Sequence, residues 1–376
     1  MLTKEASYHR CLCQKHQIQK LRGRDKMLRS AQHDNTRLMA KITFDGIEVE
    51  VPDGTTILNA ARQIGGGIVP PAMCYYTPLK GSGGKCRACL VRVAAGSAKD
   101  PRPMPKLVAS CITTVQDGMV VENTTSQQVM DVRKGIVEML LINHPLDCPV
   151  CDQAGECSLQ DFAFEHGVST TRYEEERRTF EKIDIGPLIQ LHMTRCILCY
   201  RCVYVADQLT PDRVHGVLGR GDASEIGTYI ENIIDNEFSG NVIDVCPVGA
   251  LTDKTFRFKQ RVWFTKPVNA HRDCATDKCN GHVTLWYKGK DVLRVTGRKD
   301  AYGEVKEWIC NTCRFDKKET ADWTLEGPAH INRASVIAQN HYELPVLNQQ
   351  VIADLPESTV RELEQNPPLR LGGLNG

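Results

Sequence analysis

Seventeen cysteines, most of them in short groups with regular spacing, constrain this sequence more than any other feature. Three explanations compete for so many cysteines: a disulfide framework, zinc sites or iron-sulfur clusters. The chain starts without an apolar signal peptide, which weakens the disulfide interpretation because secretion normally supplies the oxidising compartment. Cysteine spacing must therefore decide among the three explanations.

Composition narrows the remaining classes of function. A length of 376 residues suits two or three domains. The 47 Lys and Arg nearly cancel the 46 Asp and Glu, so net charge indicates neither a nucleic acid nor a membrane surface as partner. The longest candidate for a membrane span, Ile136 to Ile142, is far shorter than the roughly 18 apolar residues that a span requires.

Neither end of the chain has the pattern of a packed core. Residues 1–38 are basic and lack an apolar period, which predicts disorder or a non-native extension, with Met39 as the natural start. A mitochondrial transit peptide is the alternative, because the segment is rich in Arg and poor in acids. Cys11 and Cys13 lie there and are expected to be bystanders. Prolines and a Gly-rich end predict an extended tail over 331–376.

The segment after Met39 shows a compact αβ pattern. Alternating apolar residues over 41–51 predict a β-hairpin that turns at Asp45-Gly46. Thr caps and an apolar stripe predict a helix over 55–64, and a glycine run ends it. A Gly-rich loop with cysteines follows. This order of elements is the one expected of a small β-grasp ferredoxin.

A second helix and a small β unit are predicted further along. Residues 126–143 carry an apolar stripe at helical spacing, and Pro145 stops the helix. The stripe consists of Val129, Val132, Ile136 and Leu140. The charged segment 167–190 is interpreted as a linker. Short strands over 282–287 and 291–295 indicate a separate β unit.

The first cysteine set has glycines just before its central pair. Its members are Cys74, Cys86, Cys89 and Cys111, and the glycines are Gly81, Gly83 and Gly84. Glycines let the backbone wrap an inorganic core and direct amides at its sulfides. Four thiolates suit a 2Fe-2S cluster. Zinc stays an alternative, because the Cys-x2-Cys pair alone would also serve a zinc site.

The second set adds a histidine to three cysteines. Its members are His144, Cys148, Cys151 and Cys157. His144 stands four residues before the cysteine that opens a compact triplet, so it is interpreted as a ligand. Three thiolates and one imidazole can hold a 4Fe-4S cluster, and zinc with the same ligands is the alternative.

The third set is the most specific pattern in the sequence, and the fourth is the most ambiguous. Three cysteines at Cys-x2-Cys-x2-Cys with a remote Cys-Pro are typical of a 4Fe-4S cluster. These are Cys196, Cys199, Cys202 and Cys246. The fourth set has two pairs, which suit either zinc or an additional 4Fe-4S cluster. These are Cys274, Cys279, Cys310 and Cys313.

Residues 40–262 resemble the amino-terminal half of the cluster-bearing, G-type subunit of NADH-quinone oxidoreductase, the respiratory complex I. Three motifs carry the resemblance in the same order. They are Gly84 to Val91, Asn143 to Cys157, and Thr194 to Cys202 with Asp244 to Leu251. The resemblance implies one 2Fe-2S cluster on the first set and 4Fe-4S clusters on the second and third.

The chain departs from that family in two places. The gap between Cys89 and Cys111 is longer than usual, which suggests a larger loop. Residues 270–316 resemble only the opening segment of the molybdopterin-oxidoreductase-like domain that normally follows. Some bacterial members hold an extra 4Fe-4S cluster there on a tight run of three cysteines, which this chain lacks.

The family implies a function in electron transfer without a substrate site of the chain's own. Neither a dinucleotide fingerprint nor a nucleophile with its base is found. A flavin subunit would take hydride from NADH, and single electrons would pass along the clusters toward quinone. The partners implied are that NADH-binding subunit and other peripheral-arm subunits, with membrane contact only through the complex. The expected location is the cytoplasmic face of a bacterial inner membrane, with the mitochondrial matrix as alternative.

Rival functions are kept beside this one. A diaphorase subunit of an NAD-linked hydrogenase shares the first three motifs, but would usually end near residue 250. A formate dehydrogenase partner is a second rival. A zinc-stapled scaffold without redox function is the alternative from another class, since zinc is redox-silent.

The expected fold class is α+β and multidomain. It combines a β-grasp 2Fe-2S ferredoxin domain, a small cluster domain with one histidine and three cysteines as ligands, a 4Fe-4S ferredoxin-like domain and a short β unit with a four-cysteine metal site. The extension is predicted over 1–39 and the tail over 331–376. Between them, the ferredoxin domain is predicted over 40–123, the domain with one histidine over 124–166, the ferredoxin-like domain over 167–262 and the β unit over 263–330.

Overall fold

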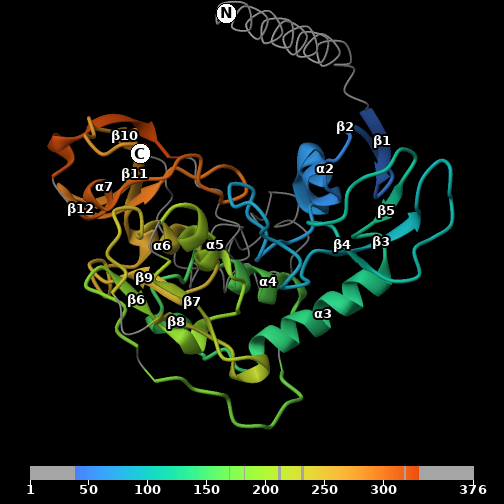
Figure 1. The fold of residues 1–376 in the computed structure, drawn as a ribbon, viewed down its shortest axis with the longest axis horizontal. Coiled ribbons are helices and arrows are strands. Elements are labelled where there is room, and N and C mark those ends of the chain that lie inside the picture. The colour runs from blue at the N-terminus through green and yellow to red at the C-terminus, as the bar shows by residue number, and fades with distance from the viewer. Residues whose placement is uncertain are drawn as a thin grey trace, which may run out of the picture. The chain divides into compact units, whose positions relative to one another are not determined.

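The computed structural model describes residues 39–168, 170–181, 183–210, 213–229, 233–316 and 319–329 (Figure 1). By its internal contacts the chain forms two compact units. Of the described residues, the smaller unit holds those from Met39 to Pro70 and Cys89–Asp131, and the larger unit holds Pro71–Ala88 and those from Val132 to Ala329. The predictions for 1–38, with Cys11 and Cys13, and for 331–376 lie outside the described residues.

The smaller unit is built on a mixed sheet with strand order β2-β1-β5-β3-β4. Its strands are β1 (Met39–Phe44), β2 (Ile47–Pro52), β3 (Leu90–Ala95), β4 (Val108–Ala109) and β5 (Val120–Glu122). β1 pairs antiparallel with β2 and parallel with β5. The predicted hairpin is confirmed: Phe44 pairs with Ile47, and the two turn residues, Asp45 and Gly46, both adopt positive φ.

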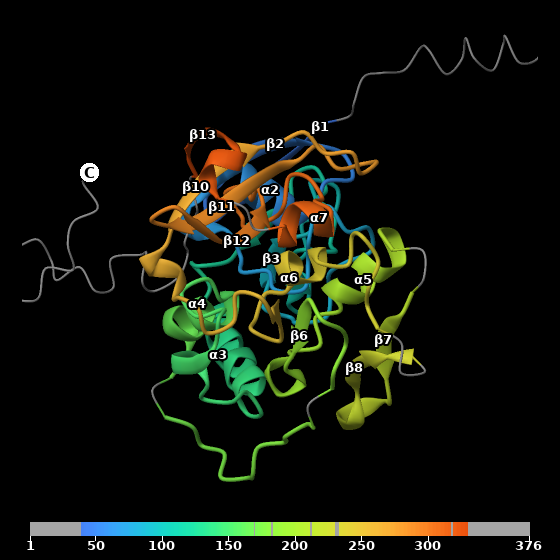
Figure 2. The ribbon, with the colours of Figure 1, turned by 90° about the vertical axis from the view of Figure 1, so that its left-hand side faces the viewer.

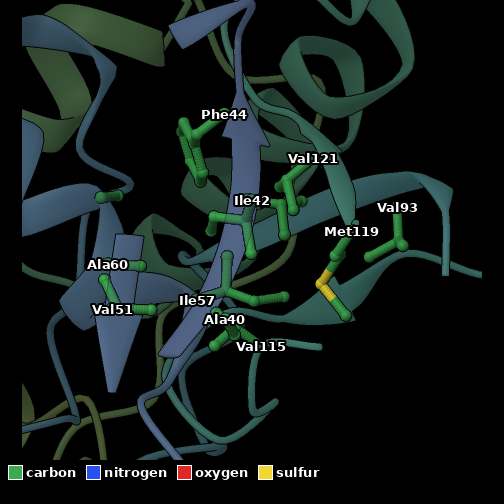
Figure 3. Close-up of a cluster of buried hydrophobic side chains, with 12 residues drawn as sticks. Ala40, Ile42, Phe44, Val51, Ile57, Ala60, Val93, Val115, Met119 and Val121 are labelled. Carbon is green, nitrogen blue, oxygen red and sulfur yellow. The ribbon is translucent and has the colours of Figure 1, made fainter. Parts of the chain in front are cut away.

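Helix α2 (Ile57–Ile64) also belongs to this unit. It begins two residues later than predicted, because Thr56 is its N-cap and accepts a hydrogen bond from Asn59 N at 3.3 Å. Gly65, with φ of 79°, ends it. Side chains from β1, β5 and α2, including Ile42, Val121 and Ile57, form the buried core (Figure 3).

Helix α3 (Gln127–Leu141) begins in the smaller unit and ends in the larger one. The predicted helix over 126–143 is therefore confirmed, with slightly shorter ends. Its predicted apolar stripe is partly wrong. Val129 and Ile136 are buried, but Val132 is exposed and Val137 is buried instead.

The larger unit contains short helices and several small sheets (Figure 2). Its helices are α4 (Ser158–His166), α5 (Arg201–Gln208), α6 (Asn241–Val245) and α7 (Asn311–Phe315). Its strands are β6 (Ile189–Leu191), β7 (His215–Leu218), β8 (Glu225–Thr228), β9 (Leu251–Asp253), β10 (Lys266–His271), β11 (His282–Lys288), β12 (Asp291–Gly297) and β13 (Thr324–Pro328). β6 pairs with β9, and β7 pairs with β8.

The carboxyl-terminal part of the larger unit is an antiparallel sheet with order β12-β11-β10-β13. The two predicted strands correspond to β11 and β12, and β10 and β13 were not predicted. A buried cluster combines side chains of this sheet, such as Val283 and Leu285, with Trp323 and with three cysteines of the fourth set. Among the described residues, no helix has the length and apolar character to cross a membrane.

Candidate metal centres

The third cysteine set surrounds one apolar cavity in the larger unit. Cys196 follows a short 3-10 turn, Cys199 lies in the loop before α5, Cys202 lies in the first turn of α5, and Cys246 follows α6 directly. Tyr200, with φ of 65°, turns the chain sharply between them. The structure therefore brings together all four members of the predicted set.

Burial sets the chemistry of these thiols. Burial is the main cause that raises the pKa of Cys199 to about 12. The nearby thiols of Cys246 and Cys74 raise this pKa further. Burial likewise raises the pKa of Cys202 and Cys246. Thiols with such high pKa values lose their protons when a cation binds, so metal binding here releases protons. Amides also face the sulfurs, as where Leu198 N donates to Cys196 Sγ at 3.3 Å.

The second set also lines a single cavity of the larger unit, and it includes the histidine. His144 follows the end of α3, Cys148 and Cys151 flank a 3-10 turn, and Cys157 precedes α4. Burial and the nearby Arg195 lower the pKa of His144 to about 4, although Asp147 opposes this. The imidazole is thus neutral at pH 7, which is the form that binds metals. All four side chains of this predicted set face the same space.

The first set is divided between the two units. Cys74 and Cys86 belong to the larger unit, where the amides of Lys85 and Cys86 donate to Cys74 Sγ at 3.3 and 3.4 Å. Gly83 and Gly84 precede them with positive φ, which turns the loop around the sulfur. Cys89 and Cys111 belong to the smaller unit. All four cysteines are buried, and their common site stays a prediction.

The fourth set is the most tightly gathered. The sulfurs of Cys274, Cys279, Cys310 and Cys313 all lie within 4.8 Å of one another. Cys274 and Cys279 flank the loop before β11, and Cys310 caps α7, which contains Cys313. The hydrogen bond from Cys313 is the largest cause that lowers the pKa of Cys310 to about 5.

Arginines next to the cysteines form contacts that the sequence analysis missed. Arg201 Nη2 donates to the carbonyl oxygens of Ala72 and Tyr75 at 3.0 and 2.7 Å. Its Nη1 donates to the carbonyl of Val245, one residue before Cys246. Arg201 thus ties the loop around Cys74 to the third set. In the sequence, only the position of Arg201 between Cys199 and Cys202 indicated that its side chain lies at the metal site.

A second arginine links the third and second sets. Arg195, one residue before Cys196, donates to Asp147 Oδ2 from Nε at 3.0 Å and from Nη2 at 2.8 Å. Asp147 stands one residue before Cys148. Gly249 makes a further link, because a Cβ at this position would overlap the sulfur of Cys151.

Sequence families match the three predicted cluster regions. Residues 38–126 match the 2Fe-2S iron-sulfur cluster binding domain. Residues 133–172 match the NADH-ubiquinone oxidoreductase-G iron-sulfur binding region, and residues 186–252 match the ferredoxin-like domain of NADH-quinone oxidoreductase subunit 3. The chain is therefore an iron-sulfur protein with ferredoxin-like domains that bind 2Fe-2S and 4Fe-4S clusters, within a mixed αβ fold.

Proteins of similar sequence show to which family of iron-sulfur proteins the chain belongs. The chain is 41% identical to the G-type subunit of NADH-quinone oxidoreductase from Rickettsia bellii, over 74% of this chain and 38% of the relative. It is also 41% identical to the NADH-ubiquinone oxidoreductase 75 kDa subunit of Reclinomonas americana, over 74% of this chain and 38% of that protein. The chain is a homologue of these NADH-quinone oxidoreductase subunits, and the resemblance expected from its motifs is confirmed. It spans less than two fifths of the length of these relatives.

A solved structure is similar as well. It is the crystal structure of the NAD+-reducing [NiFe]-hydrogenase in the H2-reduced state, of which one chain is 26% identical with a TM-score of 0.50. The match covers 59% of this chain and 91% of that chain.

Proposed function

We propose that this chain relays single electrons as a peripheral-arm subunit of an NADH:quinone oxidoreductase. The observation that carries the proposal is the central position of the third cysteine set. Arg201 connects it to the loop of Cys74 and Cys86, and Arg195 connects it to the start of the second set. Electrons would then pass from the first set through the third to the second.

The ligands proposed are the three predicted sets. Cys74, Cys86, Cys89 and Cys111 would hold the 2Fe-2S cluster, His144, Cys148, Cys151 and Cys157 one 4Fe-4S cluster, and Cys196, Cys199, Cys202 and Cys246 the other. The cavities lined by the second and third sets suit the 4Fe-4S clusters, and the amides that face Cys196 and Cys74 are suited to hydrogen-bond cluster ligands. Bound clusters supply one-electron redox chemistry, and the chain fixes their positions and tunes their potentials.

The proposal extends to domains, partners and location. We assign 40–123 to a β-grasp ferredoxin domain, 124–166 to the domain with one histidine and three cysteine ligands, 167–262 to a 4Fe-4S ferredoxin-like domain and 263–330 to a small β unit. A flavin subunit that oxidises NADH would supply the electrons, and other subunits of the arm would receive them. The complex would place the chain at the cytoplasmic face of a bacterial inner membrane.

A second candidate is a diaphorase subunit of an NAD-linked hydrogenase. The similarity to the hydrogenase chain supports it. The higher identity to the NADH-quinone oxidoreductase relatives and the sheet beyond residue 262 favour the first function. Purification of the chain together with its natural partners distinguishes the two candidates. Membrane subunits and NADH:quinone activity would support the first candidate, and a nickel-containing partner would support the second.

The relay order is tested on the purified complex by freeze-quench EPR after addition of NADH. In Cys202→Ser, the first centre should become reduced while the second stays oxidised, because the middle step is lost. Cys13→Ser, which changes a cysteine outside all four sets, is the matched control and should leave the second centre reduced as in the wild type. Reduction of the second centre at the wild-type rate in Cys202→Ser would contradict the order.

Metal analysis tests the relay itself. Anaerobically purified chain should contain about ten irons for the three clusters, with binuclear and tetranuclear EPR signals after dithionite reduction. Little iron and no signal would contradict electron transfer and favour the zinc-stapled scaffold.

A further inference from the structure

The fourth cysteine set has the dimensions of a site for one ion. Cys274 Sγ lies 3.6 Å from Cys310 Sγ, and Cys279 Sγ lies 3.9 Å from Cys313 Sγ. All four sulfurs lie within 4.8 Å of one another. Within the part of the chain that the structure describes, this is the one group of His, Cys, Asp or Glu side chains gathered so closely.

These distances distinguish a single ion from a cluster. Four thiolates around one tetrahedral zinc, each with a bond of about 2.3 Å, lie about 3.8 Å apart. In a 4Fe-4S cluster each thiolate binds a different iron, so two thiolates are separated by two iron-sulfur bonds and the iron-iron distance, on the order of 6 Å. The observed 3.6 and 3.9 Å agree with one ion and leave no room for a four-iron core.

The local structure supplies the rest of a structural zinc site. Two separate pairs, Cys-x4-Cys and Cys-x2-Cys, are the arrangement that structural zinc uses. Amides face the sulfurs, since Cys310 N donates to Cys279 Sγ at 3.4 Å and Cys313 N donates to Cys310 Sγ at 3.3 Å. The guanidinium of Arg272 interacts with Cys313 and donates to Thr312 O at 2.8 Å, which offsets part of the negative charge of four thiolates.

The position of the site explains what the ion would do. Cys279, Cys310 and Cys313 belong to the buried cluster that holds the sheet of β10 to β13 together. This sheet has a small core, and small units commonly need a metal or disulfide staple. The loop of Cys274 and the turn into α7 are far apart in the sequence, and the ion would fasten them together.

We propose that Cys274, Cys279, Cys310 and Cys313 bind one structural Zn²⁺ and not a further iron-sulfur cluster. Zinc has no redox chemistry under biological conditions, so the electron path does not extend into this sheet. The assignment does not depend on the relay function, because it rests on the sulfur-sulfur distances and on the local contacts of the four cysteines.

The test is zinc analysis with Zn K-edge EXAFS on the full chain purified anaerobically. The result expected is one zinc per chain, a shell of four sulfurs at about 2.3 Å and no iron neighbour. Two results would overturn the proposal. One is about four irons beyond those of the three clusters, and the other is zinc and extra iron both absent, with four thiols free to react.

Variants assign the ion to this site. Cys279→Ser should remove the zinc while iron, labile sulfide and all EPR signals stay at wild-type level. Cys13→Ser should retain the zinc. Loss of about four irons with a tetranuclear signal in Cys279→Ser would show a cluster there. If Cys279→Ser fails to fold, the variant Cys274→His at the partly exposed ligand is used, because a site of three cysteines and one histidine still binds zinc and should change the EXAFS shell to three sulfurs and one nitrogen.

Discussion

Arg314 donates a hydrogen bond from Nη2 to Asp244 Oδ2 at 2.6 Å, and only 1% and 2% of their side-chain surfaces are exposed. Burial raises the pKa of Asp244, but Arg314 and the amide of Gly297 outweigh it and lower the pKa overall. Arg314 follows Cys313, and Asp244 precedes Cys246 by two residues. This ion pair therefore connects the fourth cysteine set to the third.

Arg314→Met should destabilise the larger unit by about 3–5 kcal/mol, because it leaves the Asp244 carboxylate buried without its partner. The double variant Arg314→Met with Asp244→Leu should recover much of that loss, since neither charge remains. Denaturant unfolding measures both, and iron content shows whether Cys246 still binds.

The control for this pair is Arg102→Met, which removes the exposed partner of Asp100 and should leave the stability almost unchanged, because solvent screens an exposed ion pair. A double variant no more stable than Arg314→Met would show that the two side chains do not act as a pair.

Gly249→Ala should disturb the second centre although it lies in the sequence of the third. Its Cβ would overlap the sulfur of Cys151 and contact Gln153 Cβ at 3.3 Å. The expected result is loss of about four irons per chain and of the corresponding EPR signal.

Gly135→Ala is the matched control, because nothing lies within 4 Å of its added Cβ and Ala favours a helix by about 1 kcal/mol. Unchanged iron in Gly249→Ala would show that Cys151 can move aside or is no ligand.

Local patterns were predictable from the sequence, and contacts between distant segments were not. The Asp45-Gly46 turn and the Thr56 cap depend on neighbouring residues, so the hairpin and α2 follow from composition and spacing. The Arg314–Asp244 pair joins residues 70 positions apart, and nothing in a charged residue's neighbours indicates a distant buried partner. Gly249 likewise resembles any turn glycine until Cys151 lies against it.

The same distinction holds for the metal sites. Cysteine spacing predicted which residues of the second and third sets converge, because each has a compact triplet. Spacing did not distinguish a zinc ion from an iron-sulfur cluster at Cys274 to Cys313, because two pairs of cysteines can bind either of them. The choice between zinc and a cluster depends on the sulfur-sulfur distances. These distances are set by how the loop of Cys274 and Cys279 folds against the loop of Cys310 and Cys313.

His144→Cys should lower the reduction potential of the second centre, by on the order of 100 mV, because a thiolate adds one negative charge where a neutral imidazole was bound. An EPR-monitored redox titration measures the shift. His166→Ala is the matched control. His166 has a pKa that burial also lowers to about 4, but it packs against Phe162 and lies outside the ligand set. An unchanged potential in His144→Cys would contradict ligation by His144.

Asp45 gives the smaller unit a stability that depends on pH. Its carboxylate accepts hydrogen bonds from the amides of Asn123 and Thr124 at 2.6 and 3.0 Å and from the hydroxyl of Thr125 at 2.8 Å. Burial raises the pKa of Asp45, but these hydrogen bonds outweigh it and lower the pKa below its usual value of 3.8. A lowered pKa in the folded state means that the stabilisation is complete above the unfolded pKa and is lost as pH falls through the folded one.

Asp45→Asn should therefore reduce the free energy of unfolding by about 1 kcal/mol at pH 7, a value kept small because the side chain is partly exposed. The difference between wild type and variant should shrink as pH falls below about 4. Denaturant unfolding of both proteins at each pH measures it, and comparison at equal pH cancels the acid lability of the clusters. A difference that stays constant from pH 7 to pH 3 would exclude the charge of Asp45 as its cause.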